Sequence, residues 1–301
     1  MKQKLTCKDW LLATRPWSFT ASALSVVVVL VYLEWLTGSV NWTNGALAVL
    51  GIILFHAAGN TWSDYCDFKS GVDTVEGAIS IDTIKGGLFR AEQIRNLSFG
   101  LLIPGVMIGL WLLYTTGWGL LWIGLGGVIC TLCYPPLKYR ALGDLVIVLA
   151  YGLLPALGTS WVAVGKIDWR VLWAALPVAL LVDAILHANN TRDAKTDGKA
   201  NIRTMAMGMG VKASAVLYTL EQSLPFAWVV LLIPFGIFPW LSILVTFVMR
   251  FAIRNSRSMR EFKETGNVAE IADLDQRSAQ TQMLFAMVFC ISLLVDMLLL
   301  R

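Results

Sequence analysis

Nine stretches of about 20 mostly apolar residues recur along the chain, and they restrict its possible folds more than any other feature. A hydrocarbon core of ~30 Å requires ~20 apolar residues for one helical crossing, so nine crossings use about 180 residues and leave the rest for loops. Of the 301 residues, 57% are hydrophobic and 15% are charged. This composition excludes a water-soluble domain and predicts an all-α, polytopic membrane protein.

The nine predicted helices are separated by polar or turn-forming segments. We place them at Trp17 to Leu36, Gly45 to Asp64, Ile94 to Tyr114, Trp118 to Cys133, Leu142 to Val164, Val171 to Asn190, Val211 to Ile233, Phe235 to Arg254 and Thr281 to Leu300. The first apolar stretch has no small-residue cleavage site and is interpreted as a retained helix. We expect a single domain over residues 1–301, with one four-helix repeat at about 10–140, a second at about 141–278 and a final helix at about 279–301.

Lysine and arginine are distributed unevenly among the loops. Of the 24, 21 lie at the N-terminus or beside the loops after the second, fourth, sixth and eighth predicted helices, and only Lys166, Arg170 and Arg301 lie on the other side. By the positive-inside rule, the N-terminus and the first group of loops are cytoplasmic, and the C-terminus is on the opposite side. In a bacterium this membrane is the cytoplasmic membrane. We expect the lipid bilayer as a partner and no nucleic acid, and the oligomeric state stays open.

Two polar stretches of the same design interrupt the apolar pattern. The first is GNTWSDYCDFKSGVD, at the end of the second predicted helix, and the other is DAILHANNTRDAKTDGKANIR, at the end of the sixth. Both helices run toward the cytoplasm. On a helix, Asn60, Asp64 and Asp67 fall within about 60° of one another, and the corresponding Asn and Asp residues of the second stretch fall within about 80°. Each set therefore points in one direction.

Carboxylates that point together repel one another unless a cation lies between them. Magnesium bound by a few carboxylates and by substrate phosphates is a common solution, and nearby Lys and Arg can neutralise the remaining phosphate charge. The alternative interpretation is a pair of solvated helix ends, because polar residues gather at any membrane boundary. Two sets with similar spacing on the same side of the membrane favour a shared diphosphate site.

The two stretches also resemble known motifs. NTWSDYCDFKSGVD is similar to the first Asp-rich motif of the UbiA superfamily of intramembrane prenyltransferases, and NNTRDAKTDGKANIRT is similar to the second. The Arg15-Pro16 pair at the start of the first helix, the Tyr134-Pro-Pro-Leu-Lys138 segment and the nine-helix pattern agree with that family as well. The resemblance extends over essentially the whole chain.

Members of that superfamily transfer a polyprenyl group from its diphosphate to an aromatic or other acceptor. The resemblance implies that the cofactor is Mg²⁺, held by Asp64, Asp67, Asp73, Asp193 and Asp197. It implies diphosphate binding by Asn60, Asn189, Asn190, Arg15, Lys69, Arg192 and Lys138. The implied catalytic set is Asp64, Asp67, Asp193, Asp197, Lys138 and Tyr134. In this set, Tyr134 contacts the diphosphate or shields an allylic cation.

The first motif departs from the general family pattern, because Phe68 replaces its last carboxylate and Asp67 is the second one. The resulting D-Y-x-D-x-x-x-G-x-D pattern, together with Lys85-Gly86, is similar to the branch that prenylates 1,4-dihydroxy-2-naphthoate in menaquinone synthesis, with loss of the ring carboxylate. Other family acceptors are 4-hydroxybenzoate, a chlorin, haem and glycerol phosphate. A cation or proton-coupled transporter is the alternative from another class of protein.

Two histidines and the acid Asp183, all within predicted helices, allow more than one interpretation. Asp183 falls within the hydrocarbon depth, where acids are candidates for function. His187 follows it by about one helical turn, so both an Asp183–His187 hydrogen bond and a role near the acceptor are open. His56 is one turn before Asn60 and is interpreted as a helix-packing residue.

The remaining polar features have simple interpretations. Cys130 and Cys133 lie in an apolar stretch without a second cysteine pair, so we interpret them as small packing residues. The arginines at the end of the eighth predicted helix are expected to contact lipid headgroups, and they are Arg250, Arg254 and Arg257.

Overall fold

The computed structural model describes residues 5–71, 84, 86–200 and 202–300. Their secondary structure is helical, apart from an isolated bridge between Arg140 and Arg203. The elements of the first half are α1 (Cys7–Ala13), η1 (Pro16–Ser18), α2 (Phe19–Thr37), α3 (Trp42–Lys69), α4 (Ala91–Thr116) and α5 (Gly119–Lys138). Then come α6 (Gly143–Val148), the π-helical turn η3 (Leu149–Leu153), α7 (Leu154–Val164), α8 (Val171–Arg192) and α9 (Ala194–Lys199). The last are α10 (Met205–Leu232), η4 (Ile233–Phe235), η5 (Trp240–Val248), α11 (Met249–Thr265), η6 (Val268–Ile271) and α12 (Leu274–Leu300).

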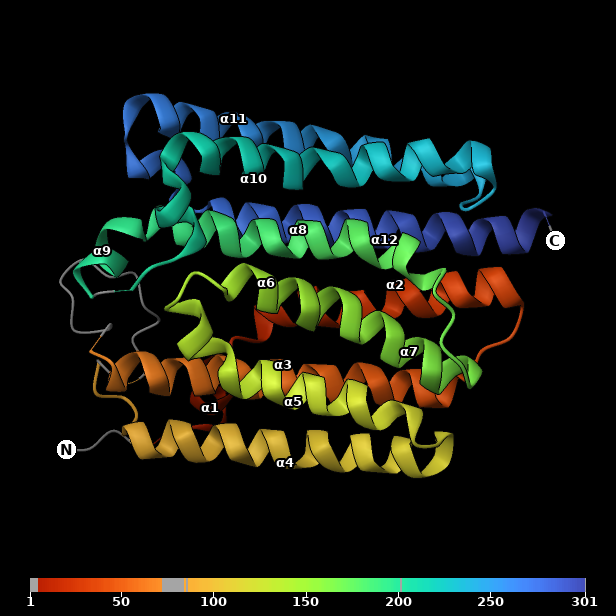
Figure 1. The fold of residues 1–301 in the computed structure, drawn as a ribbon, viewed down its shortest axis with the longest axis horizontal. Helices are drawn as coiled ribbons and strands as arrows, with labels where there is room; N and C mark the ends of the chain where they lie inside the picture. The colour runs from red at the N-terminus through yellow and green to blue at the C-terminus, as the bar shows by residue number, and fades with distance from the viewer. Residues whose placement is uncertain (1–4, 72–83, 85, 201, 301) are drawn as a thin grey trace.

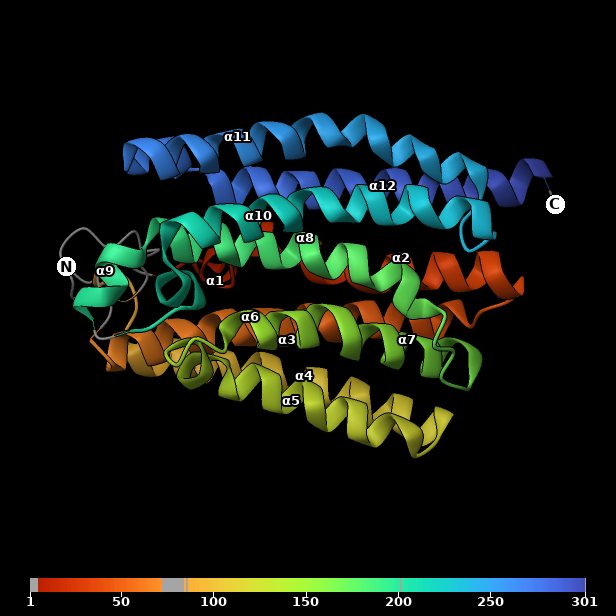
Figure 2. The same ribbon diagram turned by 45° about the horizontal axis from the view of Figure 1, so that its top comes forward.

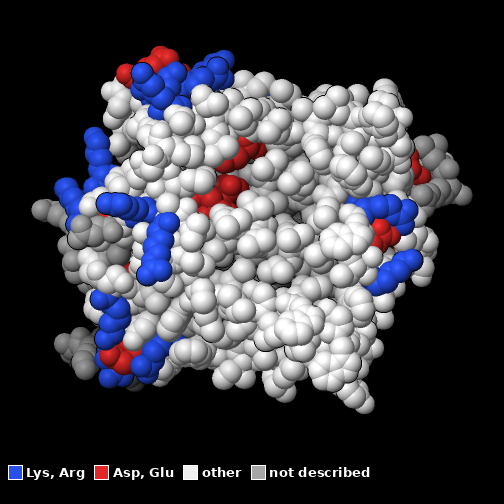
Figure 3. All heavy atoms as spheres, viewed as in Figure 1, with Lys and Arg blue, Asp and Glu red and all other residues white. Residues whose placement is uncertain are grey.

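The long helices lie roughly parallel along one direction of the molecule (Figure 1). Among the described residues, eight helices are long and apolar enough to cross a membrane. On the face shown in Figure 3, Lys and Arg gather at the two ends of the helices and leave a broad band between them, as expected for a bilayer-embedded surface. The predicted all-α membrane fold is therefore confirmed.

The eighth predicted helix, Phe235 to Arg254, is wrong in its bounds. Gly236 adopts a left-handed conformation with φ 68° and ends η4, and helical structure resumes only after Pro239. The segment then continues through η5 into α11, which ends at Thr265. It packs against α10 (Figure 1). Because η5 is short and α11 is strongly charged, length and composition support eight spans, and the predicted count of nine is not confirmed.

Several helices extend beyond their predicted ends and carry polar residues with them. The second predicted helix continues from Asp64 to Lys69, and Gly71, with φ 76°, follows it. The final helix begins at Leu274, seven residues before its predicted start at Thr281. The fifth predicted helix is interrupted by η3 just before Pro155, whose missing N–H cannot join the helical ladder. These changes determine which polar side chains reach the site.

The centre of the bundle is formed by α2, α8 and α12, which pack against one another. In both ribbon views, α10 and α11 lie on one side of α8, while α4 and α5 lie on the other (Figures 1 and 2). Large buried side chains at this centre include Tyr32, Phe285 and Phe289, and Phe226 of α10 packs against them. Two elements that sequence patterns did not predict, α1 and α9, lie at the same end of the bundle, and we call it the α9 end.

Candidate active site

A cavity of about 900 Å³ runs from the α9 end into the bundle. Its polar part is lined by residues of η1, α3, α5, α8, α9 and α12, and its apolar part is lined mainly by α3, α4, α5 and α7. Ten of the predicted site residues line it, namely Arg15, Asn60, Asp64, Asp67, Tyr134, Lys138, Asn189, Arg192, Asp193 and Asp197. Both polar stretches of the sequence therefore face a single cavity.

The first half of the polar part is built on the C-terminal end of α3. Asn60, Asp64 and Asp67 all line the cavity because α3 stays helical through Lys69 and keeps them on one face. The guanidinium group of Arg15 forms an ion pair with the Asp64 carboxylate. Arg15 adopts a left-handed conformation with φ 57° and ψ 59° directly before η1, which is uncommon for a residue with a side chain. The left-handed turn at Arg15 thus occurs at the residue whose guanidinium group lies beside α3.

Asp67 is the second carboxylate of the α3 half. The Nζ atom of Lys138, at the end of α5, lies 3.6 Å from its Oδ2 atom. The hydroxyl of Tyr139 donates a hydrogen bond of 2.5 Å to its Oδ1 atom. Tyr139 lies just beyond the spanning helix, where burial and the adjacent Asp67 carboxylate raise the pKa of its hydroxyl. Tyr139 therefore serves as a neutral donor to Asp67.

The second half is centred on Arg192, a buried residue at the end of α8. Its Nε and Nη2 atoms donate to the two carboxylate oxygens of Asp193, at 2.9 and 3.0 Å, and it also contacts the Oδ1 atom of Asn189. Its Nη1 atom lies 3.0 Å from the Oδ2 atom of Asp275 in α12. A guanidinium group with this many acceptors is fixed in place, which suits recognition of a phosphate or carboxylate.

The helix pattern assumed for the second stretch is interrupted at Asp193, where α8 ends and α9 begins. The backbone N–H of Asp193 still bonds to the carbonyl of Asn189, and that of Asp197 to the carbonyl of Asp193, both at 2.9 Å. The i to i+4 spacing is therefore kept across the junction. Asn189, Asp193 and Asp197 consequently all face the cavity, as the helical wheel predicted.

The two halves meet around Lys138. Burial raises the pKa of Asp197 to about 6, the Lys138 ammonium group opposes this shift, and the carboxylates of Asp193 and Asp67 add to it. The connecting loops also meet, because the backbone N–H of Arg203 donates to the carbonyl of Tyr139 at 3.2 Å. The Lys138 ammonium group thus interacts electrostatically with Asp67 of α3 and with Asp197 of α9.

The chemistry of the donors fits magnesium. Across the described ranges, no three His, Cys, Asp or Glu side chains form a preassembled metal cage. Mg²⁺ seldom needs such a cage, because it keeps water and is usually held by one or two carboxylates together with substrate phosphates. The cavity mouth offers hard oxygen donors of this kind, and the carboxylates of Asp64, Asp67 and Asp193 each lie beside a basic residue whose charge suits a diphosphate.

Some predicted site residues are not brought to the cavity. Lys69 is exposed and lies over the ring of Tyr65, 6.0 Å from its centroid. Asn190 is buried in α8 but does not line the cavity, whereas its neighbour Asn189 does. Asp73 and Lys85 lie outside the described residues. The binding roles predicted for Lys69 and Asn190 are therefore unsupported by their positions.

Of the two alternatives for Asp183 and His187, a hydrogen bond between them is wrong. The Nδ1 atom of His187 lies 3.0 Å from Oε1 of Glu221, and its Nε2 atom lies 2.6 Å from the hydroxyl of Ser214. Both partners belong to α10, because this face of α8 packs against α10. Asp183 and His187 lie away from the cavity lining, so a direct role near the acceptor is not supported either.

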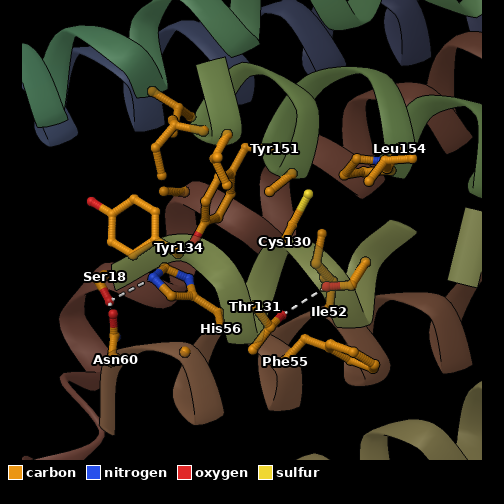
Figure 4. Close-up of a pocket in the computed structure, with 18 of the residues that line it drawn as sticks. Ser18, Ile52, Phe55, His56, Asn60, Cys130, Thr131, Tyr134, Tyr151 and Leu154 are labelled. Atoms are coloured by element: carbon orange, nitrogen blue, oxygen red, sulfur yellow. Dashed lines mark hydrogen bonds between the residues drawn. The ribbon is translucent and has the colours of Figure 1, made fainter. Parts of the chain in front are cut away.

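The middle of the cavity is lined by aromatic and hydroxyl groups. Tyr134, Tyr151 and His56 gather there, with Ser18 and Asn60 to one side (Figure 4). The rings of His56 and Tyr151 meet edge to face with centroids 5.1 Å apart. His56, which sequence reasoning treated as a packing residue, therefore also borders the cavity. Aromatic faces can stabilise a nearby cation.

The deep part of the cavity is apolar and contains glycines from α4 and α5. A Cβ atom added at Gly109, Gly124 or Gly127 would meet no atom within 4 Å, since these positions border open space. Leu112, Leu120 and other aliphatic side chains complete the lining. This chamber provides room for a flexible apolar chain.

Two polar partners in the site were missed by sequence reasoning. Tyr139 directly follows the predicted Lys138, but nothing in the sequence shows that it bonds to Asp67. Asp275 is about 80 residues from its partner Arg192, and it enters the site only because α12 starts earlier than predicted. An Asp in the first turn of a helix was the available signal, and it is a weak one.

Comparisons with known proteins are consistent with this architecture. The profile of the UbiA prenyltransferase family matches residues 22–266. UbiA prenyltransferase domain-containing protein 1 from Danio rerio is 32% identical over 226 residues, covering 73% of this chain and 67% of that protein. The homolog from Drosophila melanogaster is 32% identical over 236 residues, covering 73% of this chain and 63% of its own length. The chain thus spans slightly less than two thirds of the fly protein.

Solved structures show the same fold. A UbiA homolog from Archaeoglobus fulgidus, described as bound to GPP and Mg²⁺, has a TM-score of 0.61 at 13% identity and covers 93% of this chain and 99% of its own. A digeranylgeranylglyceryl phosphate synthase has a TM-score of 0.63 at 15% identity, with 96% and 98% covered. On the family profile, the relatives and the shared fold, the chain belongs to the UbiA prenyltransferase family.

Proposed function

We propose that this protein transfers a polyprenyl group from polyprenyl diphosphate to an aromatic acceptor in a magnesium-dependent reaction. The observation that carries this proposal is a single cavity with an acidic and basic mouth and an apolar interior. A diphosphate fits the mouth, and a prenyl chain fits the interior. The Archaeoglobus fulgidus homolog with GPP and Mg²⁺ supports the same donor class and cofactor.

Each polar group at the mouth has a proposed role. Asp64 and Asp67 on one side, and Asp193 and Asp197 on the other, would hold Mg²⁺ together with the diphosphate, and Asp73 stays a proposed fifth ligand. When bound, Mg²⁺ supplies charge stabilisation to the departing diphosphate. In this proposal the amide oxygens of Asn60 and Asn189 support that arrangement.

The basic residues stabilise the leaving group. Lys138, Arg15 and Arg192 are held beside the carboxylates, so they present positive charge at the position where diphosphate charge develops. The C1–O bond of the donor breaks and its electron pair leaves with the diphosphate. Tyr134, which lines the middle of the cavity, is placed to shield the resulting allylic cation from water.

For the acceptor we propose 1,4-dihydroxy-2-naphthoate. In that reaction a ring carbon forms a bond to C1 of the prenyl group, and the ring carboxylate leaves as carbon dioxide while its electron pair restores the aromatic ring. The support is the D-Y-x-D-x-x-x-G-x-D pattern that begins at Asp64. The relatives found are UbiA prenyltransferase domain-containing protein 1 homologues and do not point to this branch, so the acceptor rests on the motif.

We also propose that the α9 end faces the cytoplasm, because the predicted loops rich in Lys and Arg lie there. This orientation lets a soluble aromatic acid reach the mouth from water while the prenyl donor arrives from the bilayer. The proposed two four-helix repeats place α3 and α8 at corresponding positions, which agrees with the way their ends face each other across the cavity.

The experiment that tests the proposal supplies the purified protein with a long prenyl diphosphate, Mg²⁺ and one acceptor at a time. Dihydroxynaphthoate and 4-hydroxybenzoate are compared by mass spectrometry of the products, and diphosphate release is measured in parallel. We expect prenylated, decarboxylated naphthoate and no product in the presence of a chelator. Ion flux in liposomes without diphosphate release would instead support the transporter.

A further inference from the structure

Ser18, at the end of η1, is the meeting point of three hydrogen bonds beside the cavity. Its Oγ atom lies 2.8 Å from the carbonyl oxygen of Arg15, 3.1 Å from Nδ2 of Asn60 and 3.2 Å from Nε2 of His56. Ser18, Asn60 and His56 lie together at the edge of the cavity (Figure 4). One hydroxyl group therefore connects the left-handed turn at Arg15 with two side chains of α3.

The hydrogens of this group can be counted. The single hydroxyl hydrogen of Ser18 is donated either to the carbonyl of Arg15 or to the Nε2 atom of His56, according to the tautomer of the ring. The amide nitrogen of Asn60 only donates, so Ser18 accepts there. The hydroxyl of Ser22, beside Nδ1 of His56, likewise bonds to the carbonyl of Phe19, and a neutral imidazole has only one N–H for the two serines. In either tautomer the hydrogen of Ser18 is donated to Arg15 or to His56, and Ser18 accepts from Asn60.

The same count fixes the orientation of the Asn60 amide. Its Nδ2 atom has a second partner, the carbonyl of Thr14, at 3.0 Å. Rotating the amide by 180° would place its oxygen against that carbonyl and against a Ser18 hydroxyl whose hydrogen is already donated. Both contacts would then join two acceptors. The amide nitrogen is therefore held toward Thr14 and Ser18, and Oδ1 is the atom left for the cavity.

We infer that Ser18 is a positioning residue, which holds the Asn60 amide oxygen toward the magnesium-diphosphate group. His56 supports it through the contact of its Nε2 atom with the Ser18 hydroxyl, while its Nδ1 atom is anchored 3.0 Å from Ser22 in α2. The inference rests on the proposed function, because it assumes that the cavity mouth binds a metal-diphosphate. Neither Ser18 nor His56 was part of the set implied by the family motifs.

The test compares Ser18→Ala with Ser25→Ala. Ser25 lies on the same helix segment, is buried, and bonds its hydroxyl only to the carbonyl of Ala21 within the described residues, so it is a matched control outside the cavity lining. Binding is followed as the rise in unfolding temperature of the detergent-solubilised protein when Mg²⁺ and inorganic pyrophosphate are added. Prenyl transfer is measured separately. The binding readout does not depend on turnover.

For Ser18→Ala, we expect the magnesium pyrophosphate concentration giving the half-maximal shift to rise about tenfold, the usual scale for losing an outer hydrogen-bond partner of a metal ligand. Ser18→Thr keeps the hydroxyl and should restore most of the binding. In an Asn60→Ala background, Ser18→Ala should add less than about a twofold change, because the two residues act through one contact. Ser25→Ala should bind like the unmodified protein.

Unchanged binding by Ser18→Ala, or full additivity with Asn60→Ala, would overturn the inference. If Ser18→Ala is recovered in too small an amount, His56→Gln in the same two backgrounds measures the same coupling. A protein that binds magnesium pyrophosphate through Ser18 and Asn60 but yields no prenylated product would overturn the proposed reaction while upholding this inference. Failure of the unmodified protein to bind magnesium pyrophosphate would overturn both.

Discussion

Helix α8 carries titratable residues on two faces, and the two faces differ in their surroundings. On one face, Arg192 and Asp193 border the cavity and form part of a network of alternating positive and negative groups. On the other face, Asp183 and His187 are buried against α10, where His187 bonds to Glu221. We call Asp183, His187, Ser214 and Glu221 the α8–α10 cluster.

The comparison shows that an acid within a membrane helix is not by itself a catalytic site. The α8–α10 cluster has no Lys or Arg within hydrogen-bonding distance among the described residues and does not line the cavity. The cavity mouth combines carboxylates, guanidinium groups and an ammonium group next to an apolar chamber. The cavity mouth differs from the α8–α10 cluster in having open volume and in having basic groups beside its carboxylates. Both features depend on tertiary structure.

The largest effect is expected at the carboxylates of the mouth. Asp64→Ala and Asp193→Ala should each lower kcat/KM by about 100-fold to 1,000-fold, the range seen when a group that stabilises developing charge is removed. Folded protein should still be recovered from the membrane. Asp168→Ala is the matched control, since Asp168 bonds to Arg170 away from the cavity. Near-normal turnover by both Asp64→Ala and Asp193→Ala would show that the cavity face of α8 is no more important for catalysis than the face packed against α10.

A smaller loss is expected for Arg192→Lys. Lysine keeps the charge but cannot reproduce the two-pronged contact with Asp193 or the additional contact with Asp275. We expect kcat/KM for prenyl transfer to fall about tenfold, equivalent to loss of one good charge-assisted hydrogen bond. Arg170→Lys controls for the chemical change, because Arg170 is exposed and pairs with Asp168 away from the cavity, and it should leave turnover unaffected.

The α8–α10 cluster should respond in stability and not in catalysis. His187→Ala removes the buried partner of both Glu221 and Ser214, and we expect a loss of about 1–2 kcal/mol in the free energy of unfolding. Activity per folded molecule should stay unchanged. Unfolding in detergent by heat, with activity normalised to folded protein, separates the two effects. A loss of specific activity equal to that of Asp193→Ala would make this cluster part of the site.

The smallest effect is expected for Asp183→Asn. Asp183 is buried and its Oδ1 atom has no hydrogen-bond partner among the described residues, so replacing it with the uncharged amide of similar size removes no charge-assisted bond seen there. We expect the free energy of unfolding to change by less than about 1 kcal/mol, toward greater stability if it changes at all, because burying a charge is costly. Strong destabilisation would mean that this carboxylate has a partner essential to the fold.

Much of the architecture was predictable because the bilayer imposes a simple rule on helix length. The apolar stretches located the long helices, and helical periodicity placed Asn60, Asp64 and Asp67 on one face of α3, as the structure shows. The same rule failed for the segment from Phe235, where Gly236 and Pro239 shift the start of the helix. Turn geometry at single residues is less constrained than the overall apolar pattern.

The finer contacts of the site were not predictable, since they join distant segments. The pairing of Asp275 with Arg192 and of Tyr139 with Asp67 depends on how α12 and α5 pack against their neighbours. Local spacing offered Asp183, on the same helix, as one possible partner of His187, but packing against α10 supplies Glu221. The spacing of residues along a helix shows which of them share a face, but it does not show which other helix packs against that face.

The apolar chamber has a consequence for side reactions. Its walls near Gly109, Gly124 and Gly127 offer almost no hydrogen-bonding groups, so water gains little by entering once a hydrocarbon tail is seated there. In the proposed reaction, the prenyl tail of the donor would then exclude water from the chamber, so the donor itself would suppress hydrolysis of its reactive carbon. A donor whose prenyl chain is too short to fill the chamber would leave room for water, and a larger share of that donor would be hydrolysed to the free alcohol.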